Sequence, residues 1–330
     1  MDLPPELIAR PVFSTAEARA CGVTSADLAS ARQEGRISSV RRGWWTARSV
    51  RWPSERHALR VQSEVRDRSA VCPSHESGLV VAGLPTHPAS LGQVHLRRLG
   101  PGLYQNRGPL VIHECLTTTP QLVAVPFPHD AVDGLFPDGG LGLCVLDLPR
   151  LVVEAALHCP VTGLMAADAL LRRGLTSRSG LAEWAACLQR REGVARLAAV
   201  LHLVDVRHES PGESRVTWVA HGLGYRLEPQ VPVMTRRGPR RLDAMLEGEW
   251  VALEHDGEVK YVAGPQDTTR NDALLREKVR EDDVRDLGVE FVRVSKEMLD
   301  TPALLLERVE RARVRARRRH GPARRRAGRI

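Results

Sequence analysis

The segment from residue 240 to 260, RRLDAMLEGEWVALEHDGEVK, constrains the fold more than any other part of the chain. Apolar and polar residues alternate on both sides of Gly248-Glu249, a Gly-X pair that suits a two-residue type II′ turn. With that turn, the numbers of cross-strand partners sum to 497, so Asp243 lies opposite Glu254 and Asp256 projects from the same face. The opposite face carries Leu242, Ala244, Leu246, Val251 and Leu253.

The opposed carboxylates of this hairpin need an explanation, because like charges facing each other destabilise a sheet. A bound cation or a raised pKa would relieve the repulsion. Mg²⁺ is a hard ion that prefers oxygen ligands, and Mn²⁺ is an alternative. A solvated outer face on which Arg241 and other basic groups screen the acids is the competing interpretation.

The 330 residues exceed the size of one common domain, so we expect two or three. The six cysteines form no C-x-x-C pair, which argues against a disulfide framework or structural zinc. The histidines at positions 57, 75, 87, 95, 113 and 158 are too dispersed to predict a metal site. Because no export signal or long apolar run occurs, we expect a soluble cytoplasmic protein with no membrane partner.

The positive charge is concentrated at the C-terminus. Residues 311–330 hold ten arginines and no acid, and subtracting these ten from the net +8 leaves −2 for the preceding residues. Such a basic, disordered tail would contact DNA phosphates without reading sequence. A solvated end with no partner is the alternative.

Residues 1–50 are predicted to form a helix-turn-helix followed by a basic hairpin. Ser14 with Glu17, and Thr24 with Asp27, have the spacing of helix caps, and residues 37–45 alternate as a strand pair around two arginines. The segment FSTAEARACGVTSADLASARQEGRISSVRRGWW resembles the N-terminal winged helix of AbiEi-type antitoxins. The resemblance implies that the second helix enters a major groove of DNA. Its candidate DNA-binding residues are Ser25, Ser30, Arg32 and Gln33, with Arg41 and Arg42 near phosphates.

Residues 51–206 have a mixed α/β pattern and are predicted to form a connector domain. We expect helices near 55–68, 148–157, 163–172 and 177–189, and strands near 94–96 and 111–114. The segment SHESGLVVAGLP is interpreted as a linking region, and no catalytic constellation is predicted in this part.

Residues 207–310 resemble the Vsr-like (very-short-patch-repair-like) branch of the PD-(D/E)XK restriction-endonuclease-like superfamily, in particular its uncharacterised domains joined to AbiEi-type N-termini. The motifs that carry the resemblance are Glu213 in SPGESRV, Asp243 in RRLDAML, and Glu254 with Asp256 in VALEHDGEVK. The resemblance implies a mixed sheet flanked by helices, with Gln230 near the strand before the hairpin. The expected fold class is therefore α/β (α+β).

The same resemblance implies phosphodiester hydrolysis with Mg²⁺. Glu213, Asp243 and Glu254 would be the metal ligands, and the metal would acidify a water and stabilise charge on the phosphate. The superfamily pattern has lysine two residues after the second acid, where this chain has Asp256. Lys260 is the candidate substitute, with a surface lysine as the alternative.

A helix from Asn271 to Leu287, ended by Gly288, and a strand from 289 to 294 are predicted to follow. Arg280 on that helix is a candidate phosphate contact.

Three functions remain open from the sequence. The first is a Mg²⁺-dependent endonuclease acting on DNA. The second is an antitoxin-like transcriptional regulator with a cognate toxin as partner, in which the nuclease fold is weakly active or inactive. The third is a non-enzymatic scaffold whose acids are structural.

Overall fold

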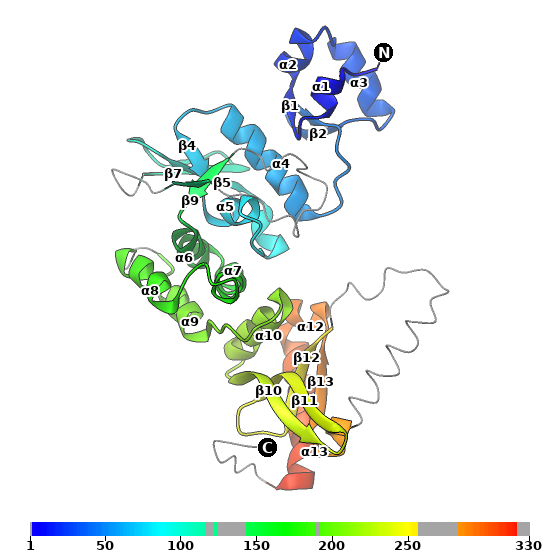
Figure 1. Cartoon of the computed structure of the whole chain (residues 1–330), viewed down its shortest axis with the longest axis vertical. Coiled ribbons are helices and arrows are strands. Elements are labelled where there is room, and N and C mark those ends of the chain that lie inside the picture. The colour runs from blue at the N-terminus through cyan, green and yellow to red at the C-terminus, as the bar shows by residue number, and fades with distance from the viewer. Residues whose placement is uncertain (1, 116–121, 125–142, 189–191, 257–282, 322–330) are drawn as a thin grey trace. The chain divides into compact units, whose positions relative to one another are not determined.

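The computed structural model describes residues 2–115, 122–124, 143–188, 192–256 and 283–321 (Figure 1). The chain divides into two compact units, a first unit of residues 1–202 and a second unit of residues 203–330. Helices and sheets occur in both units, as the predicted α+β class requires. The division lies close to the predicted boundary between residues 206 and 207. Of the helices that the structure describes, none combines the length and the apolar character needed to cross a membrane.

The first fifty residues form short helices and a small antiparallel sheet with strand order β1-β3-β2. Both predicted capping boxes are present, Ser14 with Glu17 and Thr24 with Asp27. The elements are α1 (Pro5–Ile8), β1 (Phe13–Ser14), α2 (Thr15–Ala20), α3 (Ser25–Gln33), β2 (Ser38–Arg41) and β3 (Trp44–Thr46). They enclose a core of Leu3, Leu7, Phe13, Ala18, Val23, Leu28, Ala31 and Ile37.

The rest of the first unit packs helices around a four-stranded sheet of order β4-β5-β7-β6, in which β5 and β7 are parallel. The predicted helices and strands of this part are confirmed. The elements are α4 (Pro53–Arg66), β4 (Val71–Pro73), α5 (His75–Val81), η1 (Pro88–Leu91), β5 (Val94–Arg98), β6 (Gln105–Asn106), β7 (Leu110–His113), β8 (Leu122–Ala124), β9 (Cys144–Leu146), α6 (Leu148–His158), α7 (Pro160–Arg172), α8 (Arg178–Cys187) and α9 (Val194–Leu203).

The interpretation of SHESGLVVAGLP as a linking region is wrong. Every residue of α5 is buried, and the helix packs against α6 and β5. Gly78 permits this packing, because a Cβ there would lie 2.5 Å from Cδ2 of Leu151 in α6. The segment is therefore part of the core of the first unit.

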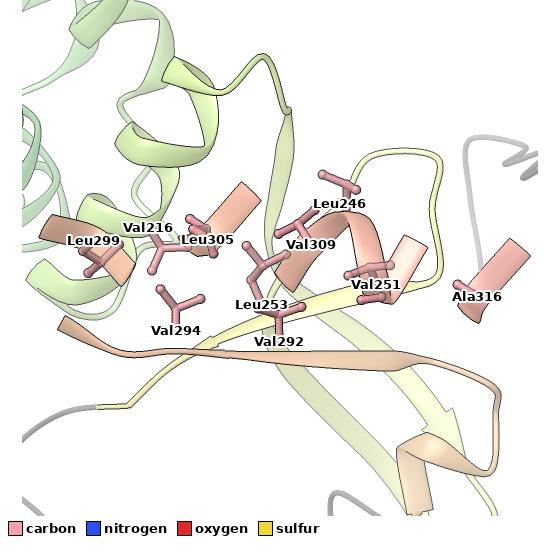
Figure 2. Close-up of a cluster of buried hydrophobic side chains, with 11 residues drawn as sticks. Val216, Leu246, Val251, Leu253, Val292, Val294, Leu299, Leu305, Val309 and Ala316 are labelled. Atoms are coloured by element: carbon pink, nitrogen blue, oxygen red, sulfur yellow. The ribbon is translucent and has the colours of Figure 1, made fainter. Parts of the chain in front are cut away.

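The second unit is a four-stranded sheet of order β10-β11-β12-β13 with helices on it. The first two pairings are antiparallel and β12 runs parallel to β13. Figure 2 shows one face of this sheet, where valines and leucines of β12 and β13 pack against α13 and α10. The elements are α10 (Pro211–Gly222), β10 (Leu227–Thr235), β11 (Gly238–Leu246), β12 (Val251–His255), β13 (Glu290–Val294), α12 (Lys296–Asp300) and α13 (Pro302–His320).

The predicted register of the hairpin between β11 and β12 is confirmed. Ala244 pairs with Leu253 and Met245 with Ala252, so the residue numbers of each pair sum to 497. The turn itself differs from the prediction. The N–H of Glu249 donates to the carbonyl of Leu246 at 3.1 Å, which makes Gly248 the second central residue, and its φ of +75° fits a type II rather than a type II′ turn.

The five apolar residues predicted for the core face of the hairpin are all buried, but the sheet is covered on both faces, and the prediction that they share one face is wrong for Leu242, which packs with Met245 and Ala252. One cluster joins the sheet to α10, α12 and α13, and a second includes Met245 and Ala252. The first contains Val216, Leu246, Val251, Leu253, Val292, Val294, Leu299, Leu305, Val309, Ala312 and Ala316. The second contains Val231, Val233, Leu242, Met245, Ala252, Val284 and Val289. Glu254 lies near the end of β12, whereas Asp243 lies inside β11 beside the buried Leu242.

The expectation of a disordered tail from residue 311 is wrong for residues 311–320, which continue helix α13. Ala312 and Ala316 are 0% and 1% exposed and belong to the core of the second unit. Ala312 and Ala316 are four residues apart and so lie on the same side of the helix, which packs on the core. The arginines between them lie on the other side, which carries charge. Residues 322–330 lie outside the described part of the chain.

Candidate functional site

The hairpin brings acidic side chains of two strands together in the second unit. The observed pairs are Ala244 with Leu253 and Met245 with Ala252, and continuing this register by one residue places Asp243 opposite Glu254. Both residues are half-buried. The backbone N–H of His255 donates to Asp243 Oδ2 at 3.4 Å, so this carboxylate lies against the end of β12.

Glu213 lies in the first turn of α10, where its carboxylate completes the helix cap. Ser210 Oγ accepts from the N–H of Glu213 at 3.2 Å and donates to Glu213 Oε1 at 2.9 Å. Glu213 Oε2 accepts from the N–H of Glu209 at 3.0 Å and from Gln230 Nε2 at 2.7 Å. The residue is 9% exposed. Three donors therefore hold the carboxylate, which has about four lone-pair sites, so acceptor capacity remains for a metal ion or a water.

Gln230 connects Glu213 to the acidic hairpin. The pairs on either side of it in β10 and β11 place Gln230 opposite Asp243. The backbone φ of Gln230 is +54°, a left-handed conformation that residues other than glycine rarely adopt. Such a conformation persists only where the surroundings enforce it, and residues of this kind gather at functional sites. Gln230 thus joins the start of α10 to the strand that carries Asp243.

His255 is a residue of this site that the sequence reasoning did not select. A Cβ on Gly212 would lie 2.3 Å from Nδ1 of His255, so the imidazole packs directly on the first turn of α10. This contact needs glycine before Glu213, and it brings the end of β12 beside the start of the helix. The position of His255 between two acids in LEHDG was the available signal.

Asp256 stands where the superfamily pattern has a lysine, and in the structure it pairs with an arginine. Arg293 Nη1 donates to Asp256 Oδ1 at 3.2 Å, and the N–H of Asp256 donates to the carbonyl of Val294 at 3.2 Å. In the parallel register of β12 and β13, Arg293 is also the partner of Glu254. A guanidinium therefore lies beside the acids. Arg241, which the alternative interpretation used to screen the acids, donates to Glu209 at 2.8 Å.

Two predicted residues of this site, Lys260 and Arg280, lie outside the described residues. The strand predicted at 289–294 is present as β13, and Gly288 has the positive φ of +83° expected after a helix. Of the predicted helix before it, residues 283–287 are described, and residues 283–285 are helical.

Most of the predicted DNA-binding residues of the first unit lie on one exposed face. Ser25, Ser30, Arg32 and Gln33 are all exposed on α3. Three of them border a hollow of about 510 Å³, which is lined by Thr15, Ser25, Leu28, Ala29, Arg32, Gln33 and Trp45, whereas Ser30 donates to Glu34 at 2.6 Å. This face of α3 therefore offers polar groups next to an indole ring.

Arg41 differs from the other predicted DNA-binding residues, because it is bound to α4. Its Nε donates to Ser63 Oγ and its Nη2 to the Ser63 carbonyl, both at 2.8 Å, and it forms an ion pair with Asp67. Arg42, the next residue, is exposed. Of the two arginines, Arg42 is the more exposed to solvent.

The prediction that the histidines are too dispersed to form a metal site is wrong. His75, His95 and His113 offer nitrogen atoms within 4.8 Å of one another, and so do His95 and His158 together with a carboxylate oxygen of Glu76. His95 and His113 come from parallel neighbours, β5 and β7. The alternation of histidine with apolar residues in VHLRR and LVIH was the only local signal, since strand order decides which strands meet.

Burial sets the protonation of this histidine cluster. It lowers the pKa of His95 to about 3 and that of His75 well below the ordinary value. It also lowers the pKa of His57, a nearby buried histidine, to about 4. The pKa of His158 is raised, because its imidazole is hydrogen-bonded to the Glu76 carboxylate. The three buried imidazoles are therefore neutral at pH 7.

We expect the free energy of unfolding to fall steeply as the pH decreases from 6.5 to about 3. In this window the unfolded chain binds protons at histidines that stay neutral in the folded chain, so protonation favours unfolding. Each pKa unit of difference is worth about 1.4 kcal/mol. His158 has the opposite effect on stability. Its contribution to the free energy of unfolding is present at low pH and is lost as the pH rises through its pKa in the folded chain.

Urea unfolding of chelator-treated protein at a series of pH values measures this effect. A His95→Gln variant should lose part of the slope, because glutamine does not titrate. The prediction fails if the wild type and His95→Gln have the same pH dependence between pH 6.5 and about 4.

No protein-family model matches the chain, and no curated protein matches it either.

Proposed function

We propose that this protein is a metal-dependent endonuclease that binds DNA through α3 and cleaves a phosphodiester bond at the acidic hairpin. The observation that carries the proposal is the convergence of acids from separate elements. Asp243 and Glu254 oppose each other across β11 and β12, and Glu213 is tied to the same place through Gln230. The sheet has apolar residues on both faces just beyond these acids.

The chemistry of the donors fits Mg²⁺ or Mn²⁺. Asp243 and Glu254 supply carboxylate oxygens from facing strands, and hard divalent ions prefer oxygen ligands. Glu213 would bind directly or through a water, with the acceptor capacity that its three hydrogen bonds leave. When bound, the ion acidifies a water and stabilises charge on the scissile phosphate.

The chain's own residues position this chemistry. Gln230 and Ser210 hold the Glu213 carboxylate, and the N–H of His255 holds Asp243. Arg293 supplies a positive charge beside Asp256, where the superfamily pattern has a lysine. This guanidinium can neutralise a phosphate oxygen, but it cannot accept a proton from water. The attacking water would therefore depend on the metal ion rather than on a lysine.

A winged-helix mode of DNA binding is the companion proposal for residues 1–50. The exposed face of α3 carries Ser25, Arg32 and Gln33 beside Trp45, and a helix with such groups fits a major groove. Arg42 is exposed in the hairpin that follows. We therefore expect Arg32→Ala and Arg42→Ala to weaken DNA binding without affecting the acids.

A second candidate function is an antitoxin-like regulator whose nuclease fold clamps DNA without cleaving it. The ion pair between Asp256 and Arg293 favours it, because an acid that is paired with arginine replaces the usual catalytic lysine. In that case the protein would bind its operator and a cognate toxin, and the acids would be a relic of catalysis or would hold a structural metal ion.

A nicking assay on supercoiled plasmid with Mg²⁺ or Mn²⁺ tests the proposal. We expect the wild type to cleave, and Asp243→Asn and Glu254→Gln to lose at least about 100-fold in rate, because each removes a charged ligand while keeping its shape. Glu247→Gln is the matched control, since Glu247 is an exposed acid in the connection of the same hairpin. It should cleave as the wild type does.

The outcomes separate the two functions. Cleavage that persists in Asp243→Asn and Glu254→Gln would exclude this hairpin as the active site. Wild-type protein that binds DNA tightly but does not cleave with either metal would favour the regulator.

A further inference from the structure

A cluster of histidines and acids in the first unit has the composition of a transition-metal site. It is formed by His75 at the start of α5, His95 in β5, His113 at the end of β7 and His158 at the end of α6, with Glu76 beside His75. One donor atom from each of His75, His95 and His113 lies within 4.8 Å of the other two, and the same holds for Glu76, His95 and His158. His95 belongs to both triads.

The fold places these rings in contact. The rings of His75 and His113 are stacked with their centroids 3.9 Å apart, and those of His95 and His158 are 4.8 Å apart. His95 Nδ1 and His113 Nε2 are separated by 3.0 Å, and His158 Nδ1 is 2.7 Å from Glu76 Oε1. Four imidazoles within one cluster are costly unless something bridges them, because their lone pairs and dipoles crowd one another.

Two polar atoms of the cluster have no hydrogen-bond partner among the residues that the structure describes. They are Nε2 of His95 and Oε2 of Glu76, and these residues are 2% and 0% exposed. A buried acceptor left without a partner costs about 1–3 kcal/mol, and more for a charged group. Both residues belong to the triad of Glu76, His95 and His158, so each has a donor atom without a hydrogen-bond partner that a metal ion could use.

The backbone at the centre of the cluster is strained. His75 has a φ of +49°, in the left-handed region that only glycine adopts readily. This conformation directs His75 and Glu76 from consecutive positions into the same cluster. Strain of this kind is retained where the surroundings or a ligand require it.

The donor set selects the class of ion. His75 and His95 are neutral at pH 7, so each has a nitrogen lone pair available for a metal. Imidazole nitrogens with one carboxylate suit Zn²⁺ and its transition-metal neighbours, whereas Mg²⁺ and Ca²⁺ prefer sites made of oxygen. The acidic hairpin of the second unit has the opposite preference.

We propose that His75, Glu76, His95, His113 and His158 form a binding site for a zinc-class divalent metal ion, with His95 as the central ligand. A cavity of about 440 Å³ borders the cluster and is lined by three of its histidines together with Tyr104, Glu192 and Arg196. An ion held there has one side open to this cavity, which is the arrangement of a zinc site that binds water or a substrate rather than a closed structural one. This site is independent of the proposed nuclease activity.

Metal analysis of the purified full-length chain tests the proposal. After loading with Zn²⁺ and dialysis, we expect one zinc per chain. Replacement by Co²⁺ should give visible ligand-field absorption with the intensity of a four- or five-coordinate site. We expect His95→Ala to weaken zinc affinity by more than the roughly 100-fold that loss of a hydrogen-bond partner of a ligand costs.

Two variants control for other causes of metal loss. His57→Gln changes a histidine that is also 2% exposed in the first unit but belongs to neither triad, and it should keep its zinc even if it is less stable. Asp243→Asn should also keep it, because the zinc is not bound at the acidic hairpin. The proposal is overturned if the wild type takes up neither Zn²⁺ nor Co²⁺, if His95→Ala keeps full occupancy, or if Asp243→Asn is the variant that loses the metal.

Discussion

Glu154→Ala should lower the free energy of unfolding by about 3–5 kcal/mol, because it leaves two buried guanidinium groups without their counter-ion. Glu154 Oε1 accepts from Arg150 Nε at 3.0 Å, and Glu154 Oε2 lies 3.1 Å from Arg97 Nη2. Glu154 and Arg150 are each 1% exposed and Arg97 is 4% exposed. Burial lowers the pKa of Arg97 and the Glu154 carboxylate beside it raises it, so the carboxylate offsets part of the cost of burying this charge.

Urea unfolding followed by circular dichroism measures this loss. Glu192→Ala is the matched control. Glu192 is an exposed acid that lines the same 440 Å³ cavity as Glu154. It should change stability by no more than about 0.5 kcal/mol. A loss of similar small size in Glu154→Ala would mean that water reaches the two arginines. Replacing all three charged residues together by apolar ones should restore much of the stability, since the unpaired charge is then removed.

The features that the sequence predicted well are those that local patterns determine. The register of β11 and β12 follows from period-two alternation, and the capping boxes of α2 and α3 follow from the spacing of Ser14 with Glu17 and Thr24 with Asp27. The turn of the hairpin was placed on the right glycine but given the wrong type. A glycine with positive φ fits either type, and only the hydrogen bond of Glu249 decides between them.

The features that the sequence did not predict depend on contacts between distant segments. The histidines come together only because β5 pairs in parallel with β7 and because α5 packs on the sheet. Arg41 was expected near phosphates, but its partners are on α4, more than twenty residues away. Its sequence neighbours gave no indication of Ser63 or Asp67. The sequence neighbours of Gln230 likewise gave no indication of its hydrogen bond to Glu213, which joins a strand to a preceding helix.

The C-terminal arginines show how composition alone misleads. A run of arginine and alanine without acids is typical of a disordered segment, but the alanines at positions 312 and 316 fall on the buried side of α13. Arg313 and Arg317 pair with Glu249 in the connection of the acidic hairpin, and Arg313 also pairs with Glu310. The carboxylate of Glu249 has its pKa lowered by these arginines, against the effect of its burial.

Deleting residues 311–330 should therefore destabilise the second unit by about 3 kcal/mol, because it removes core packing and the cations that pair with a largely buried acid. Deleting only residues 322–330 keeps the whole of α13, which ends at His320, so we expect a smaller loss in the free energy of unfolding. Chemical unfolding of the two truncated proteins makes the comparison directly. Equal stability of both would mean that the last turns of α13 do not contribute to the fold.

The same pair of proteins separates folding from DNA binding. Residues 322–330 contain four of the ten C-terminal arginines, so the shorter deletion removes these cations while keeping the core residues Ala312 and Ala316 of α13. We expect it to weaken binding to plasmid DNA and to reduce the slope of log affinity against log salt by up to about 0.9 for each lost phosphate contact. If the protein that lacks residues 322–330 has the same salt slope as the wild type, these residues do not contribute to DNA binding. In the longer deletion, by contrast, a change in affinity would reflect lost structure as well as lost charge.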